Sequence, residues 1–154
     1  MTIHSSFRNW LPFLFIIILS ACSTTEVAPQ SDDTPKTLDG KYVGGWTSTT
    51  QFTSFSNFPI SIDLILSADK TKLTGDFYAT VNYSSCCNSG TSDGRISIAL
   101  DGDIITSFSL NVVIPDCTGN FSGSGEIKPN GNLVIDITGK DCDGDHVGQL
   151  VFRK

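Results

Sequence analysis

The sequence has little positive charge: ten Lys and Arg residues stand against sixteen Asp and Glu residues, a net charge of −6 at pH 7. Proteins that bind nucleic acid present basic patches to the phosphates, so this composition argues against a nucleic-acid partner. Repulsion from anionic lipid headgroups is also expected, so attraction to a membrane must come from something other than charge. The simplest role of the acidic residues is solubility.

Long apolar runs are missing as well. The longest, residues 10–19, has about ten residues, whereas a membrane-spanning helix needs roughly 20. Arg8 precedes this run and the small residues Ser20 and Ala21 follow it, which is the layout of a secretory signal peptide. The sequence therefore predicts residues 1–21 as a cleaved leader; the alternative is an uncleaved signal anchor.

Signatures of catalysis are scarce. His4 lies in the leader, so His146 is the one histidine of the mature chain, and we expect it to be a polar residue at the rim of the domain. A catalytic triad would need it beside an activated serine or cysteine, and no G-x-S-x-G elbow occurs. Two acids could meet in space for glycoside hydrolysis, but no pair is singled out. The sequence predicts a protein that is not an enzyme and uses no cofactor.

A cysteine follows the leader directly, in the stretch LSAC that ends at Cys22. This stretch resembles the lipobox of bacterial lipoproteins, in which the cysteine becomes the first residue and its sulfur carries lipid. The resemblance implies that Cys22 anchors the protein to a membrane, since two or three acyl chains bind far more firmly than one. Ser23 after the cysteine, rather than Asp, implies the outer membrane of a bacterial cell envelope and leaves the membrane face open. Loss of the leader removes Arg8 and no acid, for a net charge of −7.

The mature chain divides into a tether and one domain. Residues 22–38 contain two prolines, many small polar residues and almost nothing to bury, which is typical of a disordered segment. Residues 39–154 are long enough to bury a single core.

The domain shows no helical periodicity. Apolar residues alternate instead with polar ones along several runs, the pattern of strands with one buried face: residues 60–66, 73–81, 96–100, 108–114 and 133–137. Asp101-Gly102 and Asn130-Gly131 favour tight hairpin turns, and the long connections fall at residues 49–59 and 83–92. The sequence predicts an all-β fold, a single antiparallel meander barrel of about eight strands. A β-sandwich is the alternative.

Two short motifs carry a family resemblance. Gly44 and Gly45 precede Trp46 on the first expected strand, and Leu73-Thr74-Gly75 follows on the third. They resemble the calycins, the lipocalin and avidin-like group, in which a Gly-Trp pair closes the bottom of the barrel. The resemblance implies a small apolar ligand inside the barrel, held by inward side chains: Trp46, Phe77, Phe108, Leu110 and Val112. Whether the interior is hollow or filled stays open, and the inner face is too apolar for biotin.

Four cysteines belong to the exported domain, where oxidation is expected. Cys117 and Cys142 lie in hairpins that a meander places at the same end of the barrel, so we predict a disulfide between them. Cys86 and Cys87 would form a second, vicinal pair, or their loop would fold over to pair with the other two cysteines. A zinc site is disfavoured because an adjacent pair lacks the two-residue spacing of a zinc knuckle.

The stretch KDCDGDH places three acids at alternate positions, Asp141, Asp143 and Asp145, which suggests a weak calcium candidate. Its glycine and the missing glutamate depart from calcium loops, and an acidic hairpin turn is the commoner explanation.

These observations together predict a lipid-anchored envelope lipoprotein that binds or carries a small apolar ligand. The alternatives are a surface or structural module that contacts an envelope protein, and an enzyme inhibitor.

Overall fold

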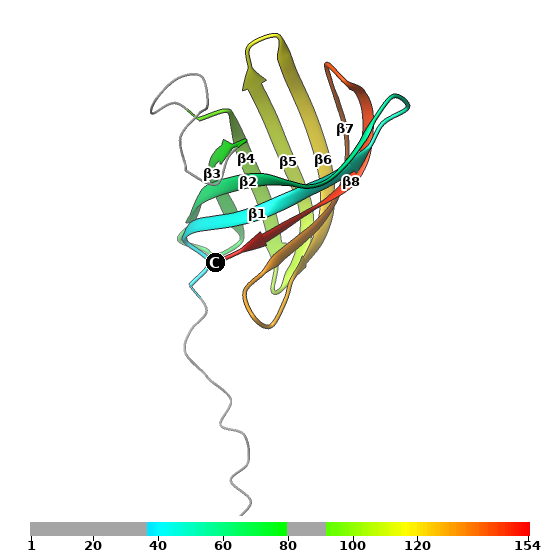
Figure 1. Ribbon diagram of the computed structural model, residues 1–154. Helices are drawn as coiled ribbons and strands as arrows, with labels where there is room; N and C mark the ends of the chain where they lie inside the picture. The colour runs from blue at the N-terminus through cyan, green and yellow to red at the C-terminus, as the bar shows by residue number, and fades with distance from the viewer. Residues whose placement is uncertain (1–36, 80–91) are drawn as a thin grey trace, which may run out of the picture. The chain divides into compact units, whose positions relative to one another are not determined.

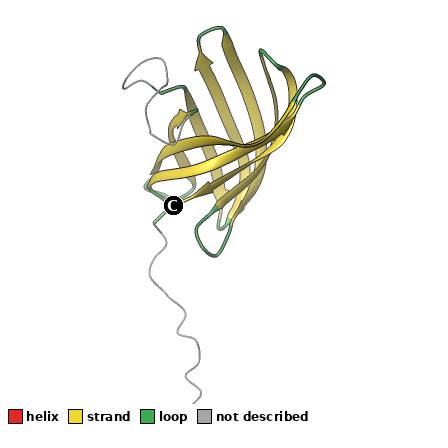
Figure 2. Cartoon of the chain, in the orientation of Figure 1, coloured by secondary structure: helices red, strands yellow, loops and turns green. Residues whose placement is uncertain are grey.

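The computed structural model describes residues 37–79 and 92–154, which form one closed antiparallel barrel with the strands in sequence order (Figure 1). Strands joined by turns and loops make up this part of the chain (Figure 2). The eight strands are β1 (Gly40–Thr49), β2 (Ser54–Leu66), β3 (Lys72–Tyr78), β4 (Gly94–Asp101), β5 (Ile104–Ile114), β6 (Cys117–Ile127), β7 (Leu133–Asp141) and β8 (Gly144–Arg153). The predicted meander barrel is confirmed, and the chain does not form the alternative sandwich.

Several predictions concern residues outside the described part of the chain. They are the leader, the lipidated Cys22, nearly all of the tether, and the cysteines Cys86 and Cys87. Among residues 37–79 and 92–154, none forms a helix of the length and apolar character needed to cross a bilayer.

The barrel closes through the pairing of its first and last strands. β1 pairs with β8 from Val43↔Arg153 to Thr49↔Val147, and its other edge pairs with β2. Closure gives each of the eight strands a partner on both sides, which reduces the sheet edge that could pair with another chain. At the N-terminal end of β1, the Lys154 ammonium contacts the carbonyl of Asp39 at 2.6 Å and lies 5.5 Å from the centre of the Tyr42 ring.

Alternate residues of every strand point into the barrel and form its core. Ile62 and Leu64 of β2 and Phe152 of β8 are at most 1% exposed, as the period-two pattern predicted. Each such side chain contributes roughly 1.5–3 kcal/mol through burial. Tyr42 belongs to this core, and its hydroxyl donates to the carbonyl of Leu38 at 3.0 Å. Burial, with a smaller effect of Asp39, raises the pKa of the Tyr42 phenol.

In a meander, successive connections alternate between the two ends of the barrel. The β1–β2, β5–β6 and β7–β8 turns lie at one end, which we call the hairpin end (Figure 1). The β2–β3, β4–β5 and β6–β7 turns lie at the other end, together with the N-terminal end of β1 and the C-terminus. This arrangement places the start of the domain and the hairpin end on opposite sides of the core.

A bulge in β2 shapes the hairpin end. The register passes from Trp46↔Phe58 to Ser48↔Phe55, so β2 has one residue more than β1 there. Asn57 adopts a φ of 55° in this bulge, and its backbone N–H donates to Thr47 Oγ1 at 3.1 Å. A Cβ at Gly45 would lie 2.0 Å from Asn57 Oδ1, so a larger residue at that position would require the Asn57 side chain to move. The expected long connection over residues 49–59 is therefore wrong, because β2 begins at Ser54 and continues through the bulge.

Candidate ligand-binding cavity

A cavity of about 270 Å³ lies inside the barrel at the hairpin end. Its wall is largely apolar and comes from strands β1, β2, β3 and β5: Trp46, Phe55, Phe58, Phe77, Val112 and Ile114. Its polar part comes from the β7–β8 hairpin: Asp141, Asp143 and His146. Phe58 is 44% exposed and Asp143 is also exposed, so the cavity reaches the protein surface.

The aromatic side chains around the cavity pack edge to face. The Trp46 ring lies 5.6 Å from that of Phe55 at 77°, and 4.8 Å from that of Phe121 at 88°. Such pairs are favourable because the positive edge of one ring meets the negative face of the other. The bulge at Asn57 makes this cluster possible, since it lets Phe55 and Phe58, three residues apart, line the same cavity.

Trp46 itself is 7% exposed, and its buried indole N–H has no hydrogen-bond acceptor among the described residues. An unsatisfied buried donor costs free energy that an acceptor on a water or a ligand would recover. Trp46 lines the cavity at the hairpin end, on the side of the core away from the start of the domain.

His146 does not occupy the polar rim position that the sequence predicts. It is 2% exposed, because the alternation along β8 turns it to the same inner face as Leu150 and Phe152. Gly139 of β7 lies directly opposite it in the sheet. The imidazole ring is also 5.5 Å from the ring of Phe121 and 5.7 Å from that of Trp46.

Both imidazole nitrogens of His146 are hydrogen-bonded. Nε2 lies 2.8 Å from Asp141 Oδ1, and Nδ1 lies 2.9 Å from Ser48 Oγ. An ionised carboxylate only accepts hydrogen bonds, so Nε2 carries a proton. With a neutral ring, Nδ1 accepts the proton of the Ser48 hydroxyl; with a charged ring, Nδ1 donates and Ser48 turns to the carbonyl of Val147 at 3.3 Å. The hydrogen-bonded array of Ser48, His146 and Asp141 is thus satisfied whether the ring is neutral or charged.

Ser48, His146 and Asp141 are the residue types of a hydrolase triad, but their placement favours a positioning role. A nucleophile must contact its substrate. Ser48 is 2% exposed and is not part of the cavity wall, whereas Asp141 is. The array therefore holds the Asp141 carboxylate in place at the wall of the cavity.

The residues predicted to contact a ligand are only partly brought together. Trp46, Phe77 and Val112 line the cavity. Phe108 and Leu110 are 2% and 1% exposed and pack in the core, because they lie further along β5 toward the other end of the barrel. The prediction missed Phe55, Phe58, Ile114 and His146. The phenylalanine-rich stretch FTSFSNF was the available signal for the first two.

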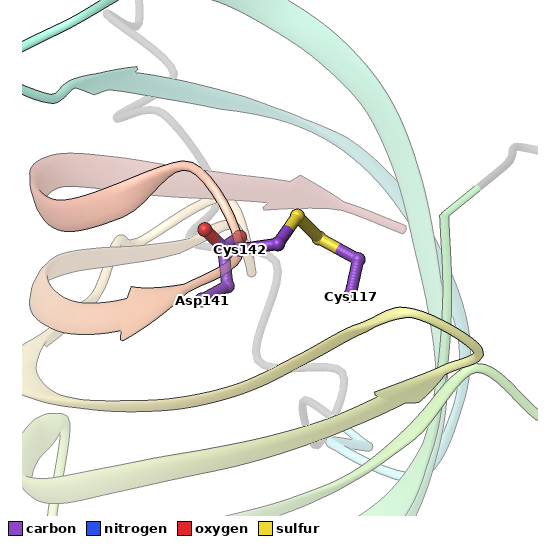
Figure 3. Close-up of side chains that lie close together, drawn as sticks. All are labelled: Cys117, Asp141 and Cys142. Carbon is purple, nitrogen blue, oxygen red and sulfur yellow. A yellow bond between two sulfur atoms is a disulfide. The ribbon is translucent and has the colours of Figure 1, made fainter.

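The predicted disulfide between Cys117 and Cys142 is confirmed, and Figure 3 shows it beside Asp141. It joins β6 to the turn after β7, beyond the last paired residues of these strands, Asn120↔Lys140. In the described part of the chain, Cys117, Cys142 and Asp141 are the one group of three potential metal ligands close enough to share an ion. Because both sulfurs are in the disulfide, this group lacks the thiolates that a metal would bind.

The three acids of the calcium candidate face different partners. Asp141 Oδ1 accepts from His146 and from the backbone N–H of Asp143 at 2.8 Å. The Asp145 side chain is 87% exposed and lies 4.0 Å from the ammonium of Lys140. The structure therefore does not bring the oxygens of these three acids together.

Comparison of the sequence with known protein families and with characterised proteins finds no match.

Proposed function

We propose that this protein is a lipid-anchored lipoprotein of the bacterial cell envelope whose barrel binds a small, mainly apolar ligand. The observation that carries the proposal is the cavity of about 270 Å³ at the hairpin end. Ligand sites commonly have volumes of roughly 300–1,000 Å³, so this cavity suits a small molecule of one or two rings. It far exceeds the space of a single water, whose share of the liquid is about 30 Å³.

The composition of the wall supports an apolar ligand with a polar end. Four aromatic rings provide surface that gains free energy when a ligand displaces water from it. The charged groups are confined to the β7–β8 hairpin, where they would orient the ligand rather than supply most of its affinity. This division between an apolar wall and a few placed polar groups is typical of small-molecule sites.

The position of the cavity is compatible with an anchor at Cys22. The first described residue, Thr37, contacts the Lys154 ammonium through its hydroxyl at 3.2 Å, at the end of the barrel opposite the cavity. A tether that joins the domain at Thr37 would therefore enter the fold at the end away from the cavity. The resemblance of LSAC to a lipobox supports the anchor itself.

The anchor predicts a clear change in localisation. In a Gram-negative host, the wild-type protein is expected to partition into the outer membrane and to incorporate radiolabelled palmitate. Cys22→Ser should abolish the label and the membrane association, because neither the acidic domain nor the short apolar leader binds a bilayer stably. Retention of the unlabelled variant in the outer membrane would contradict the anchor.

Ligand binding is measurable through Trp46, which is the one tryptophan after Cys22. The domain is expected to bind 2-phenylethanol or cyclohexanol with a change in Trp46 fluorescence. Ala79→Phe places a ring in the cavity and should weaken binding by about tenfold or more, the effect of losing about 1.4 kcal/mol of contact. The readout is a fluorescence titration with calorimetry on the same samples.

Ile65→Phe is the matched control, since Ile65 is 70% exposed on the outer face of β2 and the added ring cannot enter the cavity. Equal affinity of wild type and Ala79→Phe, or no binding of either probe, would refute the carrier function. Pull-down of an envelope protein by the lipid-free domain would then favour a surface interaction module.

A further inference from the structure

We propose that the ligand carries a positively charged amine at the end that faces the β7–β8 hairpin. This inference rests on the proposed function and names the chemical class of its ligand. Three features of the cavity support it: the charge of its wall, the hydrogen bonds of His146, and the aromatic side chains that line it.

The cavity wall is negatively charged. Asp141 and Asp143 lie in it, and no Lys or Arg is among the described residues that line it. Two cations of the described chain lie against carboxylates elsewhere: Lys41 against Asp63 at 2.9 Å, and Arg95 against Asp76 at 2.8 Å. Even with His146 protonated, two acids and one imidazolium leave a net negative charge at this wall.

His146 has no hydrogen-bonding group left for a ligand, because Asp141 and Ser48 occupy its two nitrogens. Asp141 is different. Its Oδ1 accepts from His146 Nε2 and from the backbone N–H of Asp143, while its Oδ2 accepts no hydrogen bond from the described residues. The side chain is 13% exposed and lines the cavity. The array therefore fixes a carboxylate with one oxygen free to accept a hydrogen bond from a ligand.

The aromatic wall favours the same kind of group. An ammonium is attracted to the face of an aromatic ring, most strongly to that of tryptophan, and more so when water is excluded. Trp46, Phe55, Phe58 and Phe77 approach the cavity from three strands. A carboxylate beside aromatic faces attracts a cation by charge and by its hydrogen bonds. The same acids repel an anionic ligand, so the wall also selects against fatty acids and other carboxylates.

Three probes of matched shape test this inference by calorimetry at low ionic strength: 2-phenylethylamine, 2-phenylethanol and 3-phenylpropanoate. The amine is expected to bind about tenfold more tightly than the alcohol, and the acid more weakly than either. Asp141→Asn and Asp143→Asn should each reduce the preference for the amine to about threefold or less, because the loss of a negative charge weakens binding of the amine more than binding of the alcohol. The amide oxygen of asparagine can still accept from His146 Nε2, so the array survives the first change.

Asp145→Asn provides the matched control. It removes the same charge from the same hairpin, but its side chain is 87% exposed and lies outside the cavity wall. The preference for the amine should persist in this variant. An equal loss in Asp145→Asn would assign the preference to the general acidity of the domain and overturn the site.

The outcomes separate the two proposals. Equal binding of amine and alcohol, or tightest binding of the acid, overturns the amine inference and leaves the small-ligand function standing. If none of the three probes binds, the proposed function fails and the inference fails with it.

Discussion

Replacement of His146 by alanine is expected to lower the free energy of unfolding by about 3 kcal/mol, a large share of the total of a small domain. His146 is 2% exposed and bridges Asp141 and Ser48 at 2.8 and 2.9 Å. Its removal takes one hydrogen bond from a largely buried carboxylate and one from a buried hydroxyl, and it leaves a space beside the rings of Trp46 and Phe121. Chemical denaturation followed by circular dichroism would measure the change.

His146→Phe separates packing from hydrogen bonding, since a phenyl ring occupies similar space and bonds to neither partner. It should remain destabilised by about 2 kcal/mol, the effect of losing the two hydrogen bonds alone. Asp145→Ala, one residue away with its side chain 87% exposed, should change stability by no more than about 0.5 kcal/mol. A loss below 1 kcal/mol in His146→Ala would show that water replaces the imidazole freely and that the array does not stabilise the fold.

Loss of the disulfide is expected to have an effect of similar size. Cys117 and Cys142 are 25 residues apart, and the chain-entropy model assigns about 3.5 kcal/mol to closing such a loop in the unfolded state. The double change Cys117→Ala and Cys142→Ala should therefore lower the denaturation midpoint substantially. Cys117 also lines the cavity, so the same variant should bind 2-phenylethanol more weakly than wild type does.

The control uses a background in which Cys86 and Cys87 are both serine, so that Cys117 and Cys142 are the only cysteines of the lipid-free domain. A reductant should destabilise this protein and should have no effect once Cys117 and Cys142 are also replaced. If the reductant leaves the first protein unchanged, the bond contributes little to stability.

Much of the fold could be predicted because the strands and the tight turns depend on residues that are close together in the sequence. Ile60, Ile62 and Leu64 are buried and are separated by single residues. In a sheet with one buried face, such a period of two places alternate residues in the core. Gly102 and Gly131 have φ values of 59° and 89°, so the Asp-Gly and Asn-Gly signals marked real turns. The pairing of Cys117 with Cys142 followed from the meander, since it required only that alternate turns share an end of the barrel.

The cavity was harder to predict, because it depends on register and not on composition. Trp46, Phe77 and Val112 were expected in the ligand site together with Phe108 and Leu110, which share their inward alternation. Position along the strand decided which of them line a cavity and which pack against one another. Phe55 and Phe58 were missed because a three-residue spacing does not match a strand until the bulge at Asn57 is known.

The sequence by itself determined the class of fold, the likeness of LSAC to a lipobox and the disulfide, because each depends on the order of residue types along a short stretch or on the order of the turns. Only the tertiary structure decided that the interior is hollow at the hairpin end and that His146 bridges Ser48 and Asp141. Ser48 and His146 are separated by 98 residues, and they meet only because β1 pairs with β8 when the barrel closes. Contacts made by closure depend on the register of all eight strands, and that register is a property of the whole folded barrel.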